Sequence, residues 1–269
     1  MSNYDYWLER RNKIETSIGK WVGGDDVVIR NYSLKNDLLG NATYMQVIVL
    51  NATGKLVSKN LADWLEANFI GMSYPDARIW CNQVGALCGS EGSSVSAATV
   101  AGVLAADSRA YGGSKSSLIG VDFIRQALMK VQAGMTIDQL VSQSSYKNGK
   151  PNIMGFARPV ARADERIDMY DKLRQQLGFK VGKHLKLAFE ISAYLESNFN
   201  LSMNSGGYSC AFLADQDFSA QQVYNIKCMC VASGVTACFT DYSGRAQNSF
   251  LPLKCEDIDY NGPSPRPVE

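Results

Sequence analysis

The sequence predicts a mainly α-helical fold, and three observations support this prediction. Apolar residues recur at helical spacing in several long segments, capping sequences mark two helix starts, and the alternation typical of a strand is confined to one short segment. The 269 residues are enough for one large domain, or for a large domain with a smaller companion. The hydrophobic fraction of 46% and the charged fraction of 20% are those of an ordinary globular protein.

The expected elements can be placed in order along the chain. A short strand is expected at residues 26–30, where Asp-Val-Val-Ile-Arg is bounded by glycine and asparagine. In 121–134, apolar residues at i, i+3, i+4 and i+7 form one stripe, as expected for one face of a helix. Helical segments are expected over 94–110, 121–134, 164–178, 183–199 and 223–238. Two further helix starts are expected at capping boxes, one formed by Thr136 and Gln139 and the other by Ser219 and Gln222.

Charge and cysteine usage limit the classes of partner. The net charge of +1 gives no electrostatic reason to expect nucleic acid or an anionic membrane as the main partner. The longest apolar run, near residues 47–50, is far shorter than the ~20 residues that span a bilayer. Seven cysteines without a visible secretory signal predict reduced thiols and a cytoplasmic location. With a single histidine and no paired C-x-x-C spacing, no metal site is expected.

Several short motifs follow one another along nearly the whole chain. They are Arg30-Asn31-Tyr32 with Asp37-Leu38, residues 111–114 (Tyr-Gly-Gly-Ser), 154–158 (Met-Gly-Phe-Ala-Arg) with 164–166 (Asp-Glu-Arg), 200–206 (Asn-Leu-Ser-Met-Asn-Ser-Gly), Ser233-Gly234, and 260–263 (Tyr-Asn-Gly-Pro). This order resembles the R-G-Y, D-L, H-G-G-A, G-F-G-H…D-P-R, N-V-D-x-x-S-G, R-x-x-G and Y-x-G-P motifs of citrate synthases and citryl-CoA lyases. The short length is closer to citryl-CoA lyases, and to the lyase module of ATP-citrate lyase, than to full-length citrate synthases.

The resemblance implies an all-α homodimer with a large and a small domain. The glycine loops near residues 111–117 and 204–207 bracket a possible separate lobe, so the large domain is expected at 1–112 and 206–269 and the small domain at 113–205. The active site is then expected in the cleft between the two domains. The family makes or breaks a carbon–carbon bond between an acyl-CoA and a keto acid, which implies a coenzyme A thioester and a small anionic molecule as substrates.

Three expected catalytic residues depart from the motifs of the family. Tyr111 occupies the position of the histidine of H-G-G-A, and its hydroxyl can still donate a hydrogen bond to a thioester oxygen. The competing interpretation of Tyr111 is an aromatic side chain that packs at a helix end. Arg158 replaces the histidine of G-F-G-H; it cannot shuttle protons near neutral pH but can clamp a carboxylate or phosphate. Ser202 replaces the catalytic aspartate, and a hydroxyl without a neighbouring base is a poor proton acceptor or simply a small polar filler.

The remaining expected site residues concern binding. Arg166 keeps its place in the carboxylate-binding set, and Gly155, Phe156 and Arg162 fall in the loop that contacts coenzyme A in the family. Arg158, Arg162 and Arg166 are spaced four residues apart and form either an anion-binding nest or a solvated basic face. Two further positions look like an abandoned carboxylate site: Val231 replaces the arginine of R-x-x-G, and the acidic pair Glu256-Asp257 precedes the Y-x-G-P motif.

Three functional hypotheses follow. Losing one positioned acid or base costs roughly 10²–10⁴ in rate, so the substitutions weigh against ordinary citrate synthesis. The first hypothesis is an acyl-CoA-dependent enzyme with altered substrate or chemistry, in which a carboxylate such as Asp164 or Asp241 is the base. The second is a non-catalytic pseudoenzyme that regulates or scaffolds a related protein, as a homodimer or a hetero-oligomer. The third is a binding module for a small organic acid.

Overall fold

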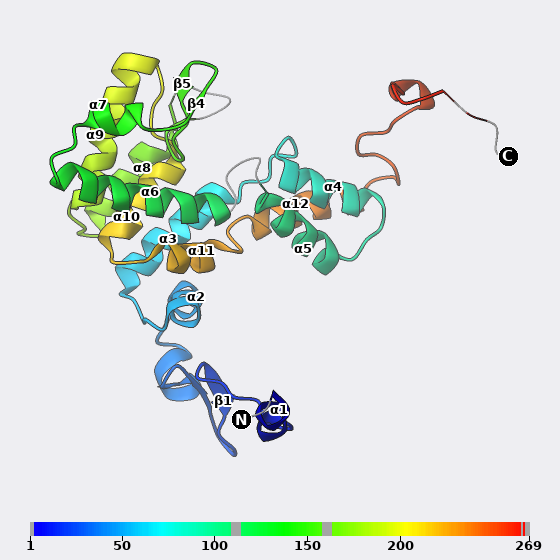
Figure 1. The fold of residues 1–269 in the computed structure, drawn as a ribbon. Coiled ribbons are helices and arrows are strands. Elements are labelled where there is room, and N and C mark those ends of the chain that lie inside the picture. Colours follow the sequence, from blue (N-terminus) through cyan, green and yellow to red (C-terminus); the bar gives the residue numbers. More distant parts are fainter. Residues whose placement is uncertain (1–2, 109–113, 158–162, 265, 267–269) are drawn as a thin grey trace. The chain divides into compact units, whose positions relative to one another are not determined.

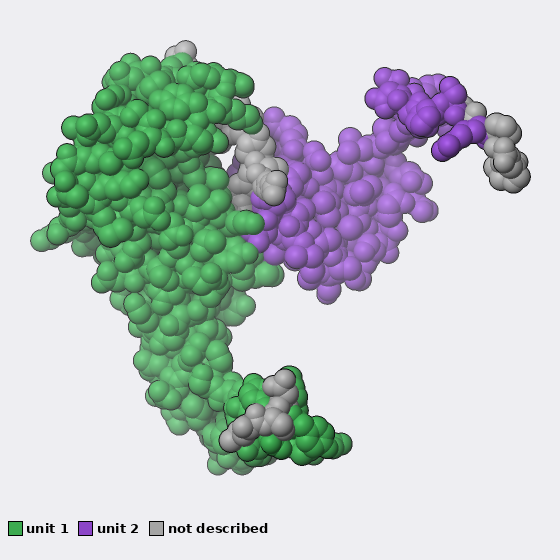
Figure 2. All heavy atoms as spheres, viewed as in Figure 1, with its two compact units in different colours: residues 1–72, 111–230 green, residues 73–110, 231–269 purple. Residues whose placement is uncertain are grey.

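The computed structural model describes residues 3–108, 114–157, 163–264 and 266, and this part of the chain is mostly helical with a few short strands (Figure 1). The mainly α prediction is therefore confirmed. The chain divides into two compact units, coloured separately in Figure 2. Unit 1 comprises residues 1–72 and 111–230, and unit 2 comprises residues 73–110 and 231–269. These boundaries differ from those expected for the large and small domains, which stay a prediction.

Unit 1 begins with a short helix and a small antiparallel sheet and continues mainly as helices. The sheet order is β1-β2-β3, with Lys20 opposite Val28 and Ile29 opposite Tyr32. Its elements are α1 (Asn3–Arg10), β1 (Gly19–Trp21), β2 (Val27–Ile29), β3 (Tyr32–Ser33), a π-helix (Leu34–Leu38), α2 (Tyr44–Thr53), α3 (Lys59–Met72), α6 (Ser114–Gln132), α7 (Ile137–Ser142), β4 (Tyr146–Lys147), β5 (Lys150–Pro151), α8 (Arg166–Gln176), α9 (Lys183–Phe199), α10 (Ser205–Asp215) and α11 (Ala220–Lys227).

The predicted helices of unit 1 are found close to their expected bounds. The segment expected at 183–199 is α9, and the segment expected at 164–178 contains α8. Both predicted capping boxes are present. The side chains of Thr136 and Ser219 accept from the backbone N–H three residues on, and the side chains of Gln139 and Gln222 accept from the N–H groups of Thr136 and Ser219. The apolar segment 223–238 belongs to two helices, because α11 ends at Lys227 and the next helix begins only at Ala232.

The core of unit 1 is built from large aromatic side chains around α10. Trp64 of α3 is fully buried, and its ring centroid lies 4.2 Å from that of Phe212 and 6.3 Å from that of Tyr208. Its indole Nε1 donates to the backbone oxygen of Tyr170 at 3.3 Å, so the ring satisfies its one polar atom. Almost every residue of α10 is buried, which makes this helix the centre of the unit.

Unit 2 is a set of three packed helices, α4 (Trp80–Ser90), α5 (Val95–Ala106) and α12 (Ala232–Ser243), followed by a short 3₁₀ helix (Cys255–Asp257). Small residues bring these helices together. A Cβ atom added to Gly85 would lie 2.4 Å from the backbone oxygen of Val235, and one added to Gly102 would lie 2.4 Å from the Val235 side chain. The hydroxyls of Thr99 and Thr236 meet at 2.9 Å across the α5–α12 contact. The packing therefore depends on the absence of side chains at the crossings.

Within the part of the chain that the structure describes, one segment meets the length and composition of a membrane-spanning helix. It is Ala220–Ser243, which includes α11 and α12, and 44% of its most apolar window is buried within the structure. The core helix of a soluble protein meets the same criterion, and the buried Lys227 lies within this segment. The segment is accounted for by packing inside the two units.

Candidate functional site

An ion pair at the start of α8 ties three distant segments of unit 1 together. Arg166 donates from Nε to one Asp164 carboxylate oxygen and from a terminal nitrogen to the other, both at 2.7 Å. Its other terminal nitrogen donates to the backbone oxygen of Gly71 at 2.8 Å. The same carboxylate accepts from the backbone N–H of Ser205 at 2.8 Å, at the first turn of α10. The expected substrate-binding arginine is thus held against the ends of α3 and α10.

The environment of Asp164 lowers the pKa of its carboxyl group. Burial acts to raise the pKa of Asp164, but the Arg166 guanidinium and the Ser205 N–H together hold that pKa well below its usual range. A carboxylate with a lowered pKa is a weaker proton acceptor, which argues against Asp164 as the general base. The other proposed base, Asp241, lies exposed on α12 in unit 2 and pairs with Arg245 at 2.6 Å.

The loop before residue 158 crosses the start of α10 at close range. Gly155 has φ +92°, and a Cβ atom there would lie 2.6 Å from the Cα of Gly207. Asn204 donates from its backbone to the Gly155 oxygen at 2.9 Å and from its side-chain amide to the Ala157 oxygen at 2.6 Å. The side-chain oxygen of Asn204 accepts from Gly206 N and Gly207 N and so caps α10. Only glycine fits at position 155, because both φ and space demand it.

The structure brings part of the predicted site together in unit 1. Gly155, Arg166 and the residues that follow Ser202 converge on the first turn of α10, and Ser202 lies half-buried three residues before that helix. Phe156 is buried and meets Phe123 edge to face at 6.1 Å, so its ring belongs to the core. Tyr111, Arg158 and Arg162 lie outside the described residues, and their roles stay predictions. Val231 stands at the N-cap of α12 with 7% of its surface exposed.

Sequence analysis missed two residues beside this cluster, Lys227 and Ser209. The Nζ atom of Lys227 donates to the Ser209 hydroxyl at 3.2 Å, and both side chains are buried. The available signal was the position of the lysine: it falls four residues after Val223, on the apolar stripe of α11. A charged residue on a buried stripe is the pattern that could have pointed to it.

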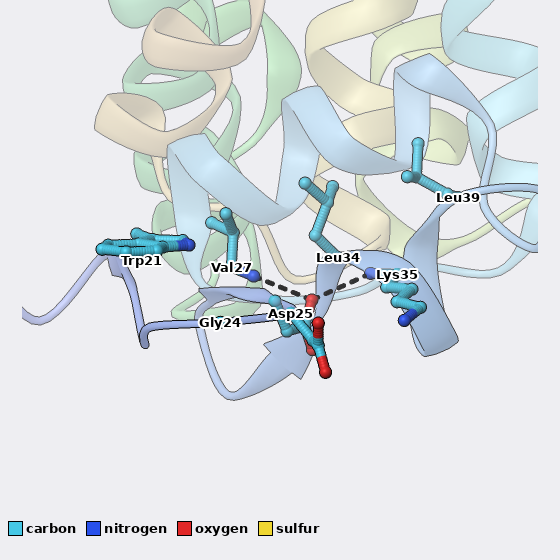
Figure 3. A pocket seen from close by; sticks show the side chains of 8 residues that line it. Trp21, Gly24, Asp25, Val27, Leu34, Lys35 and Leu39 are labelled. Carbon is cyan, nitrogen blue, oxygen red and sulfur yellow. Dashed lines mark hydrogen bonds between the residues drawn. The ribbon is translucent and has the colours of Figure 1, made fainter.

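The cavity in Figure 3 lies apart from all of these residues. It has a volume of about 310 Å³, sits beside the N-terminal sheet and is lined by Trp21, Gly24, Asp25, Asp26, Val27, Leu34, Lys35 and Leu39. Asp26 accepts from the backbone N–H groups of Val27 and Lys35, drawn as dashed lines, and from the Ser33 hydroxyl. These bonds link the start of β2 to the end of β3 and to the π-helix, so the carboxylate is occupied by local structure.

Among the residues that the structure describes, no group of three or more His, Cys, Asp or Glu side chains is placed to hold a metal ion. All seven cysteines are free thiols, of which Cys228 and Cys255 are exposed.

Comparison with solved structures identifies the fold. No protein-family model and no curated protein sequence matches the chain. The chain is similar to citryl-CoA lyase from Hydrogenobacter thermophilus, with 22% identity, a TM-score of 0.80, and coverage of 95% of this chain and 97% of that one. It is also similar to ATP citrate lyase from Methanothrix soehngenii in complex with citrate and coenzyme A, with 15% identity, a TM-score of 0.75, and coverage of 98% of this chain and 45% of that one.

A third structure extends the comparison. Citrate synthase from Thermoplasma acidophilum, in a ternary complex with carboxymethyl coenzyme A and oxaloacetate, is similar with 15% identity and a TM-score of 0.65, over 84% of this chain and 59% of that one. The protein therefore has the all-α fold of citrate synthases, as the order of its motifs predicted. Within that class it matches the citryl-CoA lyase over nearly the whole of both chains, whereas it spans less than half of the ATP citrate lyase chain.

Proposed function

We propose that this protein belongs to the citrate synthase and citryl-CoA lyase family, binds a coenzyme A thioester, and makes or cleaves a carbon–carbon bond with altered substrate or chemistry. The observation that carries the proposal is the match to a citryl-CoA lyase over 95% of this chain and 97% of that chain. The other similar structures are complexes with citrate and coenzyme A, or with carboxymethyl coenzyme A and oxaloacetate. The ligands named for these proteins define the substrate class to be tested.

Arg166 is the described residue best prepared for an anionic substrate. Its side chain is 22% exposed, while Asp164 and the Gly71 oxygen fix the guanidinium in place. A positioned guanidinium loses little freedom when it binds a carboxylate, which favours tight and directional binding. In this proposal Tyr111 polarises the thioester carbonyl, Arg158 clamps an anionic group, and the loop of Gly155, Phe156 and Arg162 lies against coenzyme A.

Titration calorimetry with acetyl-CoA and with coenzyme A tests the proposal. The wild-type protein is expected to bind both, and Arg162→Ala is expected to weaken binding roughly 10- to 100-fold, because a charged hydrogen bond contributes about 1.5–3 kcal/mol. Arg245→Ala is the matched control, since this arginine is exposed just after α12 and contacts its neighbours Asp241 and Tyr242. A wild-type protein that binds neither ligand at millimolar concentration would exclude the proposal.

The second candidate is a non-catalytic member of the same family that regulates or scaffolds a related protein. Val231 favours it, because a largely buried valine replaces an arginine that would bind substrate carboxylate. Glu256 and Asp257, which are exposed and acidic, add no cation there. An assay of citryl-CoA cleavage separates the candidates: turnover that Arg158→Ala abolishes without unfolding the protein would refute this second function.

A homodimer is part of the proposal, and unit 2 offers a face for it. On α5, the side chains of Val100 and Leu104 are exposed and lie one turn apart, so they share a face of the helix. Neighbouring exposed apolar side chains on a helix are typical of an interface, and a second copy of the same face closes the assembly symmetrically. A hetero-oligomer with a related protein would use the same face. A cytoplasmic location stays a prediction.

A further inference from the structure

Lys227 ends α11 with a side chain that is almost wholly buried. Its exposed fraction is 2%, comparable with its neighbours Phe218 and Ile226 in the core. Lysine rarely lies so deep without an opposite charge, because taking an ammonium group out of water costs several kcal/mol. A buried lysine ammonium is therefore expected to have an opposite charge beside it.

The described residues around Lys227 supply no counter-charge. Its Nζ atom donates to the Ser209 hydroxyl, which in turn donates to the Gly206 backbone oxygen at 3.1 Å. The nearby Cys210 thiol stays neutral, because burial raises its pKa to about 11 even though the charge of Lys227 acts to lower it. Asp164, which precedes α8 and contacts the first turn of α10, is already bonded to Arg166 and to the Ser205 N–H.

The N–H groups of the first turn of α10 are already bonded. The Ser205 N–H donates to Asp164, and the Gly206 and Gly207 N–H groups donate to the Asn204 side chain. The positive charge at this place is therefore that of the Lys227 ammonium, which bonds to a hydroxyl one turn further along α10. Ser202, Asn204 and Gly206 are half-buried, so this turn reaches the surface while Ser209 and Lys227 lie beneath it. A buried ammonium that lacks a counter-charge among the described residues, next to a partly exposed turn, is the feature that favours an anionic ligand here.

We propose that Lys227 binds a carboxylate of the small anionic substrate, as the cation that this chain uses in place of the arginine missing at Val231. The inference rests on the proposed function, because it takes a keto acid or tricarboxylate as the substrate class. The carboxylate approaches over the rim of Ser202, Asn204 and Gly206 and pairs with the ammonium. Arg166 is the second cation at the first turn of α10, through its bond to Asp164 and the bond of Asp164 to Ser205.

Calorimetric titration of the full-length protein with citrate tests the assignment. Lys227→Met keeps the length of the side chain and removes its charge, so citrate binding is expected to weaken roughly 10- to 100-fold. The variant is expected to fold, because an apolar side chain of similar size usually replaces a buried charge without loss of stability. Lys130→Met is the control, since Lys130 is exposed on α6; citrate affinity should stay at the wild-type value.

Two further variants keep the test decisive. Lys227→Gln covers the case in which the methionine variant misfolds, and the same loss is expected. Ser209→Ala leaves the charge and removes the hydroxyl, so citrate affinity is expected to fall by less than about threefold; a lysine that merely supports Ser209 would give equal losses in both positions. Wild-type affinity in Lys227→Met, or a wild-type protein that binds no citrate, overturns the assignment.

Titration with coenzyme A separates this inference from the proposed function. Lys227→Met is expected to bind coenzyme A as the wild type does. A loss of coenzyme A affinity with unchanged citrate affinity would assign the lysine to a phosphate and overturn the carboxylate assignment. Lysine-dependent citrate binding in a protein that binds no coenzyme A would support the inference while removing the proposed function.

Discussion

The two compact units hold their helices together by opposite means. In unit 1, large side chains fill the space between helices, with Trp64, Tyr208 and Phe212 in mutual contact and a buried ion pair between Asp164 and Arg166. In unit 2, backbones approach directly because glycines stand at the helix crossings, at positions 85, 89 and 102. Unit 1 is thus stabilised by contacts between large side chains, and unit 2 by close backbone packing at glycines.

The difference explains where chemistry can reside. A core of polar and aromatic side chains can hold a guanidinium or an ammonium in a fixed place, as unit 1 does for Arg166 and Lys227. Glycine-packed helices offer few functional groups but bring flat apolar faces to the surface, as α5 does with Val100 and Leu104. We therefore propose substrate binding for unit 1 and assembly for unit 2, and four measurements test this division.

The largest effect is expected from Asp164→Asn in unit 1. This change removes the negative charge that pairs with Arg166 and replaces one of the two acceptor oxygens by an amide NH2 group. The free energy of unfolding should therefore fall by about 3 kcal/mol, which is the low end for a broken buried pair because Arg166 is partly exposed. Urea unfolding measures the loss. Asp241→Asn, which breaks an exposed pair with Arg245, should change stability by less than about 1 kcal/mol.

The stability difference between the wild type and Asp164→Asn is expected to depend on pH. Because the folded protein holds the pKa of Asp164 below its unfolded value of roughly 3.9, the stabilisation is fully present above about pH 5 and is lost as the pH falls through the folded pKa. The stability difference between wild type and Asp164→Asn should therefore shrink as the pH is lowered from about 5 to 3. A difference that stays constant over this range would contradict an ionised Asp164 in the folded state.

A middle-sized effect is expected from Gly85→Ala in unit 2. The added methyl group meets the rigid backbone oxygen of Val235, so α4 and α12 must move apart at a cost of about 1–3 kcal/mol, partly offset by the better helix propensity of alanine. Gly244→Ala is the control, because the nearest atom to its Cβ lies 3.9 Å away. Equal stabilities for both variants, measured by thermal unfolding, would show that close backbone packing is not what holds unit 2.

The smallest effect on stability is expected from Leu104→Lys on α5. The side chain is 70% exposed, so the folded chain should change by less than about 0.5 kcal/mol. Its mass in solution should nevertheless fall from dimer to monomer, as measured by sedimentation equilibrium, because a charge would be buried in the proposed interface. Ile70→Lys, equally exposed on α3 of unit 1, should leave the mass unchanged; a monomeric wild type would rule out the α5 interface.

Much of unit 1 could be predicted from the sequence, because its helices are amphipathic and capped by side chains. The stripe of α6, the capping boxes at Thr136 and Ser219, and the bounds of α9 follow from local rules. The order of the glycine turns predicted the fold as a whole, and Gly155 and Arg166 lie in the cluster at the first turn of α10.

The rest depends on contacts between residues that are far apart in the sequence. Helix α5 is apolar on all sides, so periodicity cannot tell its Gly102 face, which packs against α12, from its exposed Leu104 face. The burial of Lys227 and the fixed geometry of Arg166 depend on α10 and on the end of α3. The two-domain boundaries and the roles of Tyr111, Arg158 and Arg162 stay predictions.

The glycine crossings of unit 2 also bear on how the protein is made. Helices α4 and α5 leave the ribosome early, but the surface that their glycines are shaped to fit, α12, comes near the end of the chain. Until then two apolar helices have only each other to pack against, and such surfaces are prone to aggregate. Synthesis of this protein should therefore respond strongly to chaperones that shield nascent chains, and a ribosome stalled before residue 232 should leave unit 2 unformed.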